Sequence, residues 1–402
     1  MPRSTAANGG IPRYQPFAGP ALFREGFRPF FLAAGLWAPM AMALWIGVLA
    51  GWIDLPTGFG PLNWHIHEML FGFAAAAVAG FLLTAIPNWT GRMPLQGEPL
   101  ILLASLWAAG RLVCAISNWT GPGVAAVVDL AFLTVLLLAV AREIVAGRNW
   151  RNLPMVGALS LLLAANGLMH LEAMGFANTA EIGRRLGLAV LLMMIGLVGG
   201  RIIPSFTRNW LAKQDAADLP AAFGVIDRMA LAGAALALAS WVVEAPSAFA
   251  GPLLIAAGCA AALRLGRWRG LATLREPLLL VLHLGHAWLA AGLLLLGVSQ
   301  STDLVPASAA LHALTAGAIG TMILAVMTRA TLGHTGRALA AGTGTTAIYA
   351  LVSLAALARV AVWWLPQSYD LLLKTAGLAW IGAFLLFLAI YGPMLLRPRQ
   401  RS

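Results

Sequence analysis

Twelve apolar runs of about 20 residues each follow one another along this chain, and they restrict its fold more than any other feature. A helix of that length crosses the roughly 30 Å hydrocarbon core of a bilayer, whereas a membrane-spanning barrel strand needs only about 10 residues. Hydrophobic residues make up 60% of the 402 and charged residues 10%, against about 25% charged residues in soluble domains. The sequence therefore predicts an all-α integral membrane protein, with the lipid bilayer as its first partner.

One polytopic domain, residues 1–402, accounts for the whole chain, because no connection between the runs has room for a soluble domain. Residues 1–27 are polar and Arg-rich and show no signal-peptide cleavage site, so they are expected to form a cytoplasmic segment. The predicted spans are residues 29–52, 64–87, 99–117, 122–146, 153–174, 182–203, 224–244, 247–266, 276–298, 306–328, 338–364 and 370–396.

The basic residues predict the orientation of these spans. With the N-terminus in the cytoplasm, all but five of the 26 Lys and Arg residues fall on the cytoplasmic side. The five exceptions are Arg111, Arg184, Arg185, Arg359 and Lys374. Because cytoplasmic loops are enriched in basic residues, this asymmetry favours twelve spans with both termini inside.

A weak internal repeat recurs every four spans. Spans two, six and ten are rich in Gly and Ala and end in related polar turns, at residues 85–90, 201–210 and 327–331. We interpret them as parts of three diverged four-helix units. Parallel repeats of this kind would place the three helices around one axis, where a central site could form.

The basic charge and the cysteines exclude several classes of function. The formal net charge of +11 is explained by span orientation, and no basic stripe with interleaved aromatics indicates nucleic-acid binding. Cys114 and Cys259 form neither a CxxC pair nor a CxxCH motif, so zinc ribbons, thiol-redox motifs and covalently attached haem are not expected. Both cysteines are expected to be small buried apolar residues.

Seven histidines lie in or beside the predicted spans, where polar side chains are costly and usually functional. On the predicted topology four share the outer half of the membrane, two lie near its midplane, and one falls in a cytoplasmic connection. In that order they are His65, His67, His170 and His312; His283 and His286; and His334.

Helical geometry separates these histidines further. His283 and His286 are three residues apart and share one helix face, so they can act on one ligand. His65 and His67 diverge by about 200° on a regular helix and would meet different neighbours. For each histidine the alternative is a buried, neutral, hydrogen-bonded ring, or a solvated ring at the membrane interface.

Imidazole ligands suit copper, iron and zinc. Without an expected thiolate, a non-covalent haem b or a copper ion fits best. Arg184 and Arg185 are expected at the outer end of span six, where they could hold haem propionates or pair with Glu181.

Four acidic or basic residues accompany the histidines. Glu68 and Glu172 stand next to or near histidines and are candidate proton carriers, or partners that fix a histidine tautomer. Arg111 and Asp129 lie in the outer halves of neighbouring spans, and their simplest role is a buried ion pair.

Four segments resemble the signature of the NnrS family. They are residues 64–73 (WHIHEMLFGF), 87–92 (PNWTGR), 200–207 (GRIIPSFT) and 312–336, which begins HAL and ends TLGHTG. The resemblance covers nearly the whole chain in order. It implies a multi-pass protein of the bacterial inner membrane, linked to nitric oxide metabolism in denitrification or nitrosative stress and containing haem and copper.

The leading hypothesis is therefore a haem- and copper-binding oxidoreductase that reduces nitric oxide to N2O with electrons from a quinol. His283 or His286 would be the axial haem ligand, and the outer histidines, His65, His67, His170 and His312, would bind metal. Two other classes stay open: a metal or proton-coupled transporter, and a haem-based sensor of nitric oxide or redox state that does not turn over.

Overall fold

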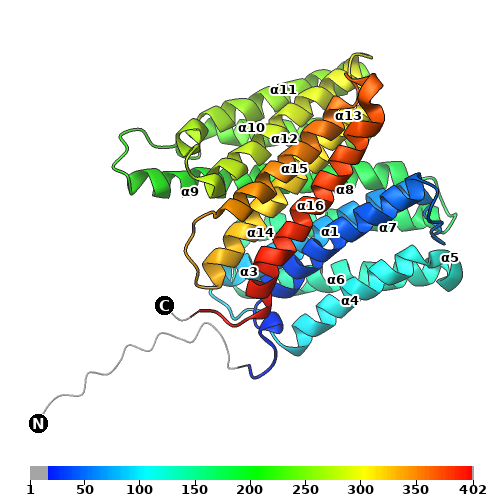
Figure 1. Ribbon diagram of the computed structural model, residues 1–402, viewed down its shortest axis with the longest axis horizontal. Helices are drawn as coiled ribbons and strands as arrows, with labels where there is room; N and C mark the ends of the chain where they lie inside the picture. Colours follow the sequence, from blue (N-terminus) through cyan, green and yellow to red (C-terminus); the bar gives the residue numbers. More distant parts are fainter. Residues whose placement is uncertain (1–16, 401–402) are drawn as a thin grey trace, which may run out of the picture.

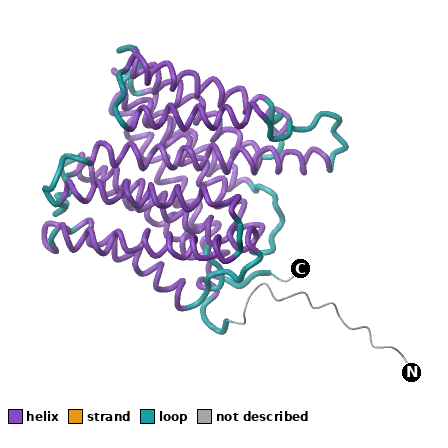
Figure 2. The backbone as a smooth tube through the Cα atoms, turned by 180° about the vertical axis from the view of Figure 1, so that it is seen from behind, coloured by secondary structure: helices purple, strands orange, loops and turns teal. Residues whose placement is uncertain are grey.

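The computed structural model describes residues 17–400. Within that range the chain is a bundle of long helices joined by short connections, with no strand (Figure 2). Twelve of its helical segments are long and apolar enough to cross a membrane. The predicted all-α membrane protein is confirmed.

The long helices run side by side (Figure 1). Nine spans are single helices: α1 (Phe27–Leu49), α4 (Glu98–Ala115), α6 (Pro122–Ala146), α7 (Leu153–Ala173), α10 (Val225–Val242), α11 (Ser247–Gly266), α12 (Pro277–Ser301), α15 (Thr343–Ala361) and α16 (Tyr369–Leu396). The other three are composite: α2, η2 and α3 (Pro61–His67, Glu68–Ala74, Ala75–Thr90), α8, η4 and α9 (Ala180–Met194, Ile195–Gly199, Gly200–Ala212), and α13, η6 and α14 (Ala307–His312, Ala313–Gly320, Thr321–His334). Short turns complete the described helices: η1 (Ala21–Phe23), α5 (Ser117–Thr120), η3 (Trp150–Asn152), η5 (Gly270–Thr273) and η7 (Pro366–Ser368).

Most helix ends fall within a few residues of the predicted spans, and two spans run longer. The sixth continues through Pro204 to Ala212, and the tenth continues to His334. His334 was expected in a connection, but it is the last residue of α14, with its ring 5.5 Å from that of Phe27. The polar Thr/Arg sequences that suggested helix ends are therefore helical.

The three composite spans form the centre of the bundle. In their apolar windows 72%, 61% and 67% of the residues are buried, whereas most of the other spans bury 28–44%. Each contains one π-helical segment, and such segments are often found at functional sites. These are the same three spans that the sequence repeat singles out.

The remaining spans surround this centre. α6 packs on α7, α11 on α12, and α16 on α1, so three consecutive groups of four spans close into a ring. The repeat itself, and the cytoplasmic position of the termini, stay predictions.

Arg28 joins the two ends of the chain where α1 begins and α16 finishes, which we call the terminal end of the bundle. Its side chain is 2% exposed. The guanidinium donates to the carbonyl oxygens of Leu395 (3.0 Å) and Arg397 (2.7 Å) and pairs with Glu25 (2.7 Å). It thereby satisfies carbonyls that the end of α16 leaves without helical partners.

We expect Arg28→Ala to lower the free energy of unfolding by about 2–4 kcal/mol, because hydrogen bonds to a charged group contribute about 1.5–3 kcal/mol. Thermal denaturation in detergent measures this loss. Arg142→Ala is the matched control, since the Arg142 side chain is 67% exposed. Equal midpoints for the two variants would show that the Arg28 contacts are not structural.

Candidate metal centre

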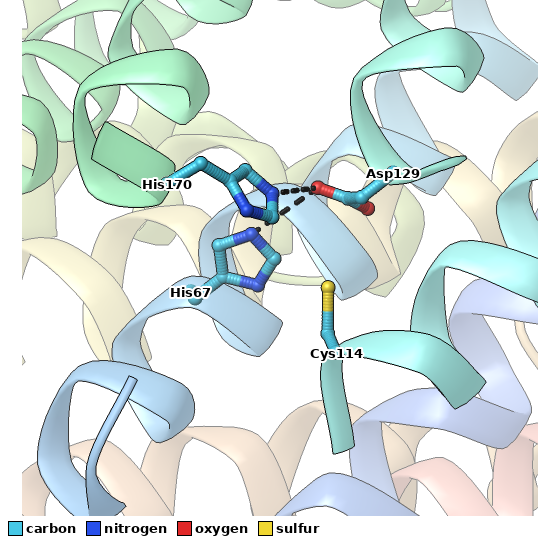
Figure 3. Close-up of side chains that lie close together, drawn as sticks. All are labelled: His67, Cys114, Asp129 and His170. Carbon is cyan, nitrogen blue, oxygen red and sulfur yellow. Dashed lines mark hydrogen bonds and ion pairs between the residues drawn. The ribbon is translucent and has the colours of Figure 1, made fainter. Parts of the chain in front are cut away.

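Four buried side chains from four different helices meet in the half of the bundle away from the terminal end. They are His67 at the end of α2, Cys114 in α4, Asp129 in α6 and His170 in α7 (Figure 3). One ligand atom from each lies within 4.8 Å of the others. No side chain of the four is more than 1% exposed. We call this group the four-residue cluster.

The carboxylate of Asp129 lies between the two histidines. Its Oδ2 is 3.0 Å from Nε2 of His170 and 3.2 Å from Nε2 of His67, and it accepts a 2.7 Å hydrogen bond from the Asn166 side chain. Its Oδ1 pairs with the guanidinium of Arg111. The predicted buried pair of Arg111 and Asp129 is confirmed, but it is part of a larger network.

Glu68 lies on the other side of Arg111. The guanidinium donates to its Oε2 at 2.8 Å, and its Oε1 is 3.0 Å from Nδ1 of His67. Two ionised carboxylates therefore face one guanidinium in a site where all three groups are at most 3% exposed. With neutral histidines and a neutral Cys114 thiol, the site carries one unbalanced negative charge. Buried charges are normally paired, so a proton on a histidine or a bound cation is needed to balance it.

The π-helical segment and a glycine shape this network. η2 begins at Glu68, directly after His67, and the two consecutive side chains are hydrogen bonded to each other. A Cβ on Gly72 would lie 2.8 Å from both Arg111 Nη1 and Glu68 Oε2. Only glycine leaves room there for the ion pair. The Trp107 indole donates to the Gly72 carbonyl at 2.9 Å and fixes that turn.

The donor set fits a transition metal ion. Two imidazoles, a thiol and a carboxylate are ligands of zinc and copper, whereas magnesium and calcium favour oxygen ligands alone. The 3.0 and 3.2 Å separations at Asp129 are close to the edge of a tetrahedron with metal–ligand bonds of about 2 Å. The Phe59 ring covers both imidazoles, at 4.6 Å from His67 and 5.0 Å from His170, and keeps water away.

The other two histidines of the outer set lie elsewhere. The ring of His65 stacks on Trp45 of α1 at 4.6 Å. His312 Nδ1 is 2.6 Å from the carbonyl oxygen of Ser308, in its own helix. His65 and His312 are close enough to interact electrostatically with each other and with Arg359. His65 and His67 thus meet different neighbours, in line with their predicted divergence.

His283 and His286 both face the sixth span. His283 Nε2 is 3.0 Å from the Thr207 hydroxyl. His286 is fully buried beside Trp268, and neither ring nitrogen has a hydrogen-bond partner within residues 17–400. The cavity against His286 measures about 20 Å³, which is room for one water-sized molecule. A haem macrocycle does not fit this arrangement.

Arg184 and Arg185 lie far from that histidine pair. Both pair with Glu181, and Arg185 also contacts Glu244 at 3.1 Å. The glycine facing His286 is Gly199, roughly 20 Å further along the same span at 1.5 Å per residue. A single haem cannot reach both places.

Glu172 accepts a hydrogen bond from the first turn of α8, the next long helix along the chain. Its Oε2 accepts a 2.7 Å hydrogen bond from the Ala180 backbone N–H at the start of α8. Its Oε1 is 3.5 Å from the Asn63 amide. The four-residue cluster does not include it.

Sequence reasoning missed Cys114 as a candidate ligand and Asn166 as a hydrogen-bond partner of Asp129. Cys114 follows Arg111 by three residues in α4, so the two share a helix face, and Asn166 precedes His170 by four in α7. That spacing was the available signal. It could not be used without knowing that α2, α4, α6 and α7 meet.

Comparison with models of protein families gave one match that covers nearly the whole chain. The model of one family, described as NnrS protein, matches residues 21–399, nearly the full length. The chain belongs to the NnrS family. A search of curated proteins gave no match. His67 belongs to the four-residue cluster, and Glu68 pairs with Arg111 beside it. Both lie in the WHIHEMLFGF segment, residues 64–73, inside the matched range.

We expect Arg111→Met to lower the free energy of unfolding by about 3–5 kcal/mol, because it leaves two carboxylates buried without their cation. Adding Glu68→Gln to that variant removes one of the two charges and should restore part of the loss. Thermal denaturation of both variants in detergent measures the coupling. Equal stability of the single and double variants would contradict the charge balance described above.

Proposed function

We propose that this NnrS-family protein is a metal-binding membrane protein whose centre is the four-residue cluster of His67, Cys114, Asp129 and His170. One observation supports this above all. Four side chains that can bind a metal converge from four helices in a buried site where two carboxylates share one guanidinium. A divalent ion would balance two negative charges. One is the carboxylate charge that Arg111 does not offset, and the other is the charge that Cys114 gains when its thiol loses a proton.

Copper is the metal that we propose. A thiolate with two imidazoles is a soft set that favours copper over the hard cations, and copper lies at the top of the divalent affinity order. The hydrogen bonds around the set also suit a metal site. Glu68 Oε1 contacts Nδ1 of His67 and orients the ring, and a bound metal ion would replace the 2.8 Å contact between His67 Nε2 and the Asn166 side-chain oxygen.

The substrate that we propose is nitric oxide, from the family resemblance. Nitric oxide is small and apolar, so it can reach a buried site through the lipid. Bound copper would supply a binding position for it and one-electron exchange. Reduction of two nitric oxide molecules to N2O and water takes two electrons and two protons, with a membrane quinol as the electron donor.

The residues around the cluster would hold the protons. Glu68 Oε1 contacts His67 Nδ1, so this carboxylate, which is not one of the four proposed ligands, can exchange a proton with an imidazole. Arg111 pairs with Glu68 and stabilises its anionic form between transfers. The Phe59 ring excludes bulk water from these transfers.

A haem stays a prediction of the resemblance. The surroundings of His283 and His286 do not accommodate one as they stand, and no step above depends on it.

We expect purified protein to bind copper in a one-to-one ratio, measured by elemental mass spectrometry. Cys114→Ser, Asp129→Asn and His170→Ala should each lose about 10-fold or more in affinity, because each removes a ligand. Cys259→Ser is the matched control, since Cys259 is exposed. His312→Ala, outside the four-residue cluster, should also keep the metal. Loss of copper from His312→Ala but not from His170→Ala would contradict the assignment.

We expect Glu68→Gln to keep copper and to slow quinol-dependent nitric oxide consumption by about 10²-fold or more, the usual contribution of a positioned proton carrier. A nitric oxide electrode measures the rate. Glu172→Gln tests the other predicted proton carrier, and with Glu172 bonded to the start of α8 its rate should stay unchanged. Copper binding without consumption in the unmodified protein would overturn the reductase proposal and favour a sensor or a transporter.

A further inference from the structure

A second feature of the bundle is a cavity of about 410 Å³ near the terminal end. The last turns of the three central composite spans line it, with Phe31 of α1 and Leu282 of α12. Its polar lining includes Asn88, Arg201, Arg329 and His334. This cavity is separate from the four-residue cluster, since none of the four cluster residues lines it.

The cavity continues toward the middle of the bundle as a narrower apolar space of about 90 Å³. The two parts share five lining residues: Phe31, Phe81, Val198, Ile202 and Val326. The narrow part is lined only by apolar side chains and glycine, including Met194, Ile195, Met322 and Ile323. The whole space is therefore amphipathic. Its larger part, which we call the wide end, has a few polar side chains among apolar ones, and its smaller, narrow part is apolar.

The two arginines at the wide end have no carboxylate partner within 4.0 Å among residues 17–400. Arg201 donates to the Asn152 side chain at 3.2 Å, and Arg329 lies over the Phe206 ring at 4.3 Å. Glu276 is near enough to interact with the charge of Arg329, but it forms no ion pair with it. Elsewhere in the bundle the buried arginines Arg28, Arg111 and Arg264 each bind a carboxylate. Among the described residues, no aspartate or glutamate lines the cavity, so its lining carries an excess of positive charge.

We propose that this cavity binds one acidic lipid, with its phosphate or carboxylate between Arg201 and Arg329 and its acyl chain in the narrow apolar part. Arginine binds such groups through paired N–H donors, strongly where water is excluded. The apolar part measures only about 90 Å³ and is lined by apolar side chains and glycine, which fits part of a hydrocarbon chain better than a macrocycle. A neutral quinone would leave the two positive charges unbalanced.

Native mass spectrometry of delipidated full-length protein tests this proposal. The probes are dioleoyl phosphatidylglycerol, oleate, dioleoyl phosphatidylcholine, ubiquinone and hemin, each added alone. We expect one tightly retained phosphatidylglycerol or oleate. Which of the two is retained more strongly identifies the phosphate or the carboxylate as the natural head group. Phosphatidylcholine and ubiquinone should be at least about 10-fold weaker.

The double variant Arg201→Gln, Arg329→Gln should lose the retained lipid. The control Arg208→Gln should keep it, because Arg208 donates a hydrogen bond to the Pro220 carbonyl and does not line the cavity. Ala330→Trp keeps both arginines and fills the wide end, so it should also lose the lipid. Lipid retention by Ala330→Trp then tests the proposal even if the double arginine variant does not fold. Equal retention of phosphatidylcholine, preferred binding of hemin or ubiquinone, or unchanged binding in Ala330→Trp would overturn the proposal.

Discussion

Arg111 holds one guanidinium between two carboxylates in the interior of a membrane protein, those of Glu68 and Asp129. Placing three charges there is costly unless each is paired. The arrangement therefore requires η2, α4 and α6 to keep a fixed register, because a shift of one residue would separate the pairs. It also leaves one negative charge to be offset, and the two histidines and the cysteine lie where a metal ion could do so.

The three central spans connect this site to the rest of the fold. Each carries a π-helical segment in its buried middle, and the segment in the second span begins at Glu68 itself. The extra residue of a π-helical segment changes which side chains face inward. The same spans open toward the terminal end around a cavity with two unpaired arginines. The three composite spans thus contribute to two sites: the network around Glu68 and Arg111 in one half of the bundle, and the cavity with Arg201 and Arg329 in the other.

Span number, span length and the buried pair of Arg111 and Asp129 could be predicted from the sequence, because hydrophobic length and the cost of a lone buried charge are local properties. The distribution of the histidines could be predicted only in part. Depth along the membrane placed His65, His67, His170 and His312 together, but depth does not say which helices are neighbours. His67 and His170 meet, whereas His65 turns to Trp45. Cys114 was assigned to packing because its partners are distant in sequence, and tertiary contacts alone bring it to them.

X-ray absorption spectroscopy at the copper edge tests the central claim most directly, because it identifies the atoms bound to the metal. For protein loaded with one copper ion, we predict a shell with one sulfur at about 2.3 Å and imidazole scattering from two histidines. The sulfur should disappear in Cys114→Ser and persist in Cys259→Ser. A copper site without sulfur, or one that is the same in Cys114→Ser, would contradict a metal centre at His67, Cys114, Asp129 and His170.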